Sequence, residues 1–123
     1  MRTLAAVLLA VIMSGCAVVD RVREVWPRAH DPVMVEMWVN TNLALSRVDC
    51  DAVPTGWAVV AEQSQRLSQY TNFREDPQAK NIKGLYDHAA KMAEPTVKPA
   101  FCKLGIKTAE QRLAAARSAW QGR

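Results

Sequence analysis

The sequence lacks the motifs of the common enzyme and cofactor sites. It contains no glycine-rich phosphate loop, no G-x-S-x-G serine motif, no H-E-x-x-H zinc motif and no dense acidic calcium loop. Asp87 and His88 are neighbours on an expected helix, where consecutive side chains point about 100° apart, and no nucleophile accompanies them. We therefore predict no catalytic residue, no cofactor and no metal ion, and we expect a protein that is not an enzyme.

Long apolar runs are also missing from the chain after its first residues. Residues 4–13 are almost wholly aliphatic and follow Arg2, and small residues come directly after them. A basic start, an apolar stretch of about ten residues and a small-residue end are typical of a secretory signal, and this stretch is too short to span a bilayer as a stable helix. The sequence therefore predicts an exported protein.

The end of this signal is Met13-Ser14-Gly15-Cys16, which resembles the lipobox of bacterial lipoproteins. Ser14, Gly15 and Cys16 match the lipobox pattern, and Met13 stands where Leu is usual. The resemblance covers residues 1–16 only. It implies cleavage before Cys16 and attachment of acyl chains to that residue, which gives stable membrane anchoring. Ala17, at a position where Asp favours the inner membrane, favours the outer membrane with the protein facing the periplasm. The alternative is an ordinary secretory signal with an incidental cysteine.

Three segments follow from this reading of the N-terminus. We expect a signal peptide at residues 1–15, a lipidated tether at 16–29 and one small helical domain at 30–123. In the tether, Val18, Val22, Val25 and Trp26 recur at helical spacing. They predict a short amphipathic helix that either lies on the membrane or packs on the domain.

Only two cysteines remain once Cys16 carries lipid. An even pair in an exported protein reads most simply as one disulfide, between Cys50 and Cys102. A metal site that combines these thiols with His30 or His88 is the weaker alternative, because no C-x-x-C ligand pair is present.

The domain reads as helical throughout. Apolar residues follow a helical period in four segments, expected near residues 32–48, 54–71, 77–93 and 97–120, and no segment alternates with period two. Prolines stand at or near the start of each segment, and Asp31 and Asp76 are placed to act as N-caps. The fold class is therefore all-α, an up-and-down four-helix bundle in which Cys50 and Cys102 meet at one pole.

Charge and surface pattern suggest where a partner would bind. The formal charge is +4, and loss of Arg2 with the signal leaves about +3; export makes nucleic acid an unsuitable partner. Lys103, Lys107 and Arg117 form a basic ridge on the fourth helix, beside an apolar stripe that ends at Trp120. This ridge either docks an acidic partner or only keeps the bundle soluble. A set of polar, uncharged residues in the second helix is likewise either a contact face or a solvated surface: Ser64, Gln65, Ser68, Gln69, Tyr70, Thr71 and Asn72.

These features together favour a lipid-anchored protein that binds another envelope protein, as an inhibitor, an exclusion factor or an accessory subunit. A carrier of a small apolar or glycan ligand is the second hypothesis, and an envelope hydrolase is the third. An internal cavity would favour the carrier, and a filled core with an exposed apolar patch would favour the binding module.

Overall fold

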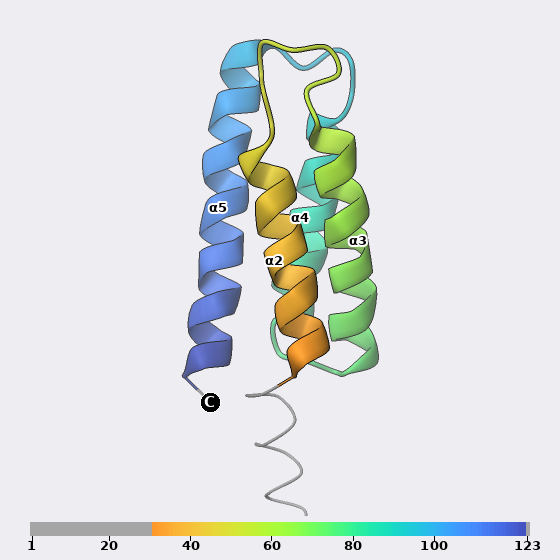
Figure 1. The fold of residues 1–123 in the computed structure, drawn as a ribbon, viewed down its shortest axis with the longest axis vertical. Coiled ribbons are helices and arrows are strands. Elements are labelled where there is room, and N and C mark those ends of the chain that lie inside the picture. The colour runs from red at the N-terminus through yellow and green to blue at the C-terminus, as the bar shows by residue number, and fades with distance from the viewer. Residues whose placement is uncertain (1–30, 123) are drawn as a thin grey trace, which may run out of the picture.

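The computed structural model describes residues 31–122, which form four antiparallel helices. The helices are α2 (Pro32–Ser46), α3 (Trp57–Phe73), α4 (Ala79–Met92) and α5 (Pro99–Gln121). They run alternately up and down, so that each helix packs against two neighbours and α5 closes the bundle against α2 (Figure 1). No strand occurs within residues 31–122, and the predicted all-α bundle is confirmed.

Both ends of the described chain lie at the same pole of the bundle. The start of α2 and the end of α5 are at the bottom of Figure 1, together with the turn between α3 and α4. We call this the N-terminal pole. The α2–α3 loop and the α4–α5 loop lie at the opposite end, the disulfide pole, where Cys50 is bonded to Cys102 with a Cα–Cα distance of 5.7 Å. This is the polarity that the cysteine positions predict.

The core is filled by the side chains that the helical period selects. Around the disulfide pole, Trp57, Val60, Leu85 and Ala109 are fully buried. A second cluster, toward the N-terminal pole, contains Met34, Leu67, Ile82, Ala116 and Trp120. Polar residues at core positions are satisfied locally, because the buried hydroxyls of Thr41, Ser64 and Thr71 each donate to the carbonyl four residues earlier.

Helix starts follow the sequence signals in two of four cases. Asp31 caps α2, since its Oδ1 accepts from the backbone amides of Val33 and Met34, and Pro32 and Pro99 occupy the first turns of α2 and α5.

The other two starts differ from the prediction. Pro54, in a cis peptide with Val53, lies in the loop before α3, which begins at Trp57 after Gly56 in the left-handed region (φ 95°). Asp76 is two residues too early to be the N-cap of α4. Its carboxylate caps a turn instead, accepting from the amide of Gln78 at 2.8 Å.

Candidate functional site

A groove runs along the seam between α2 and α5, the loosest of the four seams between neighbouring helices. Its volume is about 370 Å³, and six residues line it: Val35, Trp38, Val39, Arg117, Trp120 and Gln121. The lining is mainly apolar with one guanidinium, which suits an amphipathic partner better than a small charged ligand.

Trp38 and Arg117 join the two helices across this groove. The indole N–H of Trp38 donates to the carbonyl of Leu113 at 3.0 Å, and the Arg117 guanidinium carbon lies 5.8 Å from the centre of the Trp38 ring. A cation over a tryptophan face is worth about 0.5–1 kcal/mol at an exposed site. The pair therefore presents a half-buried aromatic ring with a positive charge held over it.

The α2 side of the seam is unusually apolar for an exposed helix face. Val35, Val39 and Leu43 follow one another at four-residue spacing, and they are 53%, 48% and 45% exposed. Val35 and Val39 line the α2–α5 groove, whereas Leu43 lines a separate groove between α2 and α3. Contiguous exposed apolar side chains bordered by polar groups are typical of interaction surfaces.

Of the predicted basic residues, only Arg117 lines the α2–α5 groove. The helical period places Lys103, Lys107 and Arg117 within about 80° of one another around the axis, with Glu110 among them. All three are exposed, and no ion pair holds them within residues 31–122. They form a row and not a cluster, because Arg117 is about 15 Å along the helix from Lys107.

Trp120, the fourth predicted contact residue, belongs mostly to the core. Its side chain is 8% exposed, and its indole N–H donates to Asp76 Oδ1 at 3.1 Å. Only its edge reaches the groove, so Trp38 offers the accessible aromatic surface there. The sequence singles out Trp120 because it ends the stripe of α5, whereas Trp38 lies within the apolar period of α2 and looks like an ordinary core position.

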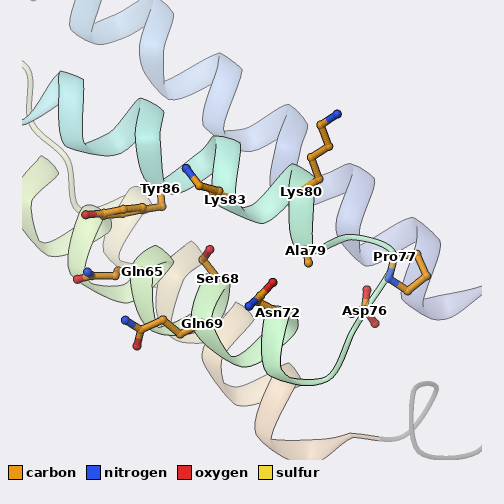
Figure 2. Close-up of a pocket in the computed structure, with 10 residues that line it drawn as sticks. All are labelled: Gln65, Ser68, Gln69, Asn72, Asp76, Pro77, Ala79, Lys80, Lys83 and Tyr86. Atoms are coloured by element: carbon orange, nitrogen blue, oxygen red, sulfur yellow. The ribbon is translucent and has the colours of Figure 1, made fainter.

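A second, polar groove lies on the opposite side of the bundle, between α3 and α4 (Figure 2). Its volume is about 650 Å³. From α3 come Gln65, Ser68, Gln69 and Asn72, and from α4 come Ala79, Lys80, Lys83 and Tyr86, with Asp76 and Pro77 at one end. The polar run at residues 64–72 thus divides: Ser64 and Thr71 turn inward, and four other residues line the groove.

The disulfide pole contains an aromatic contact that the sequence does not reveal. The Trp57 indole N–H donates to Cys102 Sγ at 3.2 Å, and its ring meets the His88 ring edge to face with centres 5.8 Å apart. His88 Nε2 lies 2.9 Å from the Gly105 carbonyl oxygen, so this nitrogen carries the proton. The His88 ring is half-buried and joins α4 to α5.

At the N-terminal pole, two side chains hold Asp31: Tyr70 of α3 and Arg74, the C-cap residue of that helix. The Tyr70 hydroxyl donates to Asp31 Oδ2 at 2.7 Å, and Arg74 Nε lies 3.6 Å from the same oxygen. Burial raises the pKa of Tyr70 above 10.0, and the hydrogen bond to Asp31 raises it further. This contact fixes the point at which the chain enters the bundle.

Neither a metal site nor a membrane span is found among residues 31–122. No three His, Cys, Asp or Glu side chains converge there, and none of the helices is long and apolar enough to cross a bilayer. Asp87 is paired with Lys83 at 2.8 Å and not with His88. Cys16, the signal peptide, the tether and His30 lie outside the described residues.

Comparison with known proteins adds no relative: no protein-family model, no curated protein and no solved structure matches the chain.

Proposed function

We propose that this protein is a lipid-anchored module of the cell envelope that faces the periplasm and binds another protein without catalysing a reaction. The observation that carries the protein-binding role is the exposed pair Val35 and Val39 in the α2–α5 groove, with exposed Leu43 one turn farther along α2. A soluble helix gains nothing from exposing three aliphatic side chains in line, and a partner that covers them gains about 25 cal/mol for each Å² buried.

The groove also suggests the chemistry of the partner. The α2 rim is apolar, with Val35, Val39 and Trp38, and the α5 rim contributes the Arg117 guanidinium, which lies over the Trp38 ring. An acidic amphipathic helix fits both rims, since its apolar face would lie on the valines and Trp38 while its carboxylates would meet Arg117, Lys107 and Lys103. We therefore propose a helix of this kind, in an envelope protein, as the occupant.

The filled core favours surface binding over transport of an enclosed ligand. The helices meet through fully buried side chains such as Trp57, Leu67 and Leu85. The grooves described above open to the surface. A carrier of a small apolar ligand would need an enclosed apolar space, so the structure offers less support for that second hypothesis.

Photo-crosslinking from defined positions tests this face. A photo-reactive amino acid at Val35 or Val39 should yield an adduct with one envelope protein, and peptide mapping should place the link on an acidic helix. The same group at Ala90, an exposed residue of α4, is the position control.

Charge reversal then tests the basic rim. Changing Lys103, Lys107 and Arg117 together to Glu should reduce the adduct yield at least tenfold and leave helicity unchanged, and added salt should reduce the wild-type yield. The control reverses Lys80, Lys91 and Lys98, which carry the same charge on other parts of the surface. Equal yields from both triple variants, or equal adducts from Ala90 and Val39, would contradict the proposed interface.

A further inference from the structure

The polar groove between α3 and α4 holds side chains whose hydrogen-bonding groups are not used inside the protein. Gln65, Gln69 and Asn72 have amides that both donate and accept, and Ser68 adds a hydroxyl. Within residues 31–122 no side-chain hydrogen bond to another protein group is found for these four. Other polar side chains of α3 are satisfied: Ser64 and Thr71 bond to the backbone, and Tyr70 bonds to Asp31.

An aromatic ring stands across from these groups. Tyr86 projects from α4 at one end of the groove, and Figure 2 shows its ring edge-on with one face turned toward Gln65. The ring face is negatively polarised and attracts C–H groups that carry a small positive charge. The groove thus combines a flat apolar platform with a row of neutral donors and acceptors.

The charges around the groove are compensated or turned away from it. Lys83 is paired with Asp87 at 2.8 Å, and Lys80 points away from α3 in Figure 2. The Asp76 carboxylate accepts from the Trp120 indole and from the Gln78 amide. An anionic ligand would therefore find one unpaired cation at the groove, Lys80, whose ammonium points away from α3, and this favours a neutral ligand over phosphate or a carboxylate.

We infer that this groove binds a neutral oligosaccharide. A pyranose ring has an apolar C–H face that can stack on Tyr86, and its rim of hydroxyls both donates and accepts, as the amides of α3 require. The volume of about 650 Å³ is in the range of small-ligand sites. Because the groove lies on the seam opposite the α2–α5 groove, a sugar and a protein partner can be bound at once.

Titration of the full chain with cellotriose and with chitotriose tests this inference. The isotope-labelled protein is kept in a detergent without a sugar head group, and the side-chain amide signals are followed by NMR. We expect saturable shifts at Gln65, Gln69 and Asn72 with at least one of the two sugars. No saturable shift with either sugar overturns the inference, and shifts with inorganic phosphate alone would assign the groove to an anion and overturn it too.

Two variants on α3 give a matched comparison. Gln69→Ala removes a groove amide and should weaken sugar binding about 2–10-fold, the range for one hydrogen bond. Gln63→Ala makes the same change on the α2-facing side of that helix and should leave sugar binding unchanged. Tyr86→Ala should weaken binding about 2–10-fold through loss of stacking, with circular dichroism confirming the fold. Equal affinities for Gln69→Ala and Gln63→Ala would overturn the assignment.

Discussion

Asp31 links the entry of the chain to the third helix through a single carboxylate. One oxygen caps α2, and the other accepts from Tyr70 and faces Arg74. This contact requires a protonated Tyr70 hydroxyl, because a Tyr70 phenolate would repel the Asp31 carboxylate and could not donate the hydrogen bond. This arrangement makes the N-terminal pole sensitive to alkaline pH.

The pH dependence of stability tests the Tyr70 contact. The pKa of Tyr70 is raised in the folded protein, so its contribution is complete below the unfolded value of 10.0 and is lost as the pH rises through the folded value. We expect the free energy of unfolding to fall as the pH rises above 10.0 and through the raised pKa of Tyr70. Tyr70→Phe should show a smaller fall, as measured by denaturant titration.

Tyr86→Phe is the control for this prediction, since it makes the same change on α4. It should retain the wild-type fall in unfolding free energy. If Tyr70→Phe and the wild type lose stability equally across this pH range, the hydroxyl of Tyr70 does not couple to the fold.

Single residues were predictable where one local rule decides their place. Asp31 follows the rule for N-caps, and Thr41 and Ser64 follow the helical period into the core despite their polarity. His88 was not predictable, because its position depends on the Gly105 carbonyl seventeen residues away on another helix. Nothing in the sequence around His88 records that contact.

At the scale of elements, the Cys50–Cys102 bond joins the α2–α3 loop to the first turn of α5. The two cysteines are 52 positions apart, so the bond closes a loop that contains all of α3 and α4. In the chain-entropy model such a loop removes about 4 kcal/mol of unfolded-state freedom. Trp57 adds a folded-state contact, because its buried N–H donates to Cys102 Sγ.

Replacing both cysteines measures this stabilisation. We expect Cys50→Ala with Cys102→Ala to lower the free energy of unfolding by about 2–4 kcal/mol, with the helical signal largely retained below the transition. Denaturant titration of the two proteins gives the difference. Non-reducing peptide mapping of the wild type should show the bond, and free thiols at both positions in protein isolated from the periplasm would contradict it.

The helices were predictable in number, order and buried faces, and less so at their starts. Apolar period fixes the buried face of each helix, and the short connections leave antiparallel packing as the simple arrangement. Proline marks a break but does not say on which side the helix begins. The loop continues for two residues after Pro54 and for one after Pro77. Backbone bonds hold these loops in another shape, from Asp49 N to the Thr55 carbonyl in the first and from Ala79 N to the Asp76 carbonyl in the second.

The grooves depend on the spacing between elements, which no local pattern encodes. The basic row of α5 was visible in the sequence, but the pairing of Arg117 with Val35 and Val39 follows from the way α2 and α5 lie side by side. The polar groove likewise needs Tyr86 of α4 opposite the amides of α3. A sequence pattern predicts which residues share one face of a helix, whereas the packing of the helices decides which faces meet.

For the molecule as a whole, the predicted lipid anchor at Cys16 would determine the location of the bundle in the cell. Cys16→Ser should abolish acyl labelling and processing by the lipoprotein pathway, because only a thiol can form the thioether to the lipid. Metabolic labelling with a palmitate analogue measures this. Cys50→Ser is the control and should label as the wild type does, while undiminished labelling of Cys16→Ser would exclude lipidation at that residue.

The disulfide also decides how the molecule would carry mechanical load. When the protein is pulled at residues 31 and 122, which lie at the same pole, α2 and α5 separate first at that pole and then toward the disulfide pole. The force then passes through the Cys50–Cys102 bond, so α3 and α4, which lie between the two cysteines in the sequence, bear none of it. Full extension between residues 31 and 122 is limited to about 140 Å, against about 320 Å for the reduced chain. If the protein is anchored and bound as proposed, two of its four described helices stay unstretched under any pull that leaves the sulfur–sulfur bond intact.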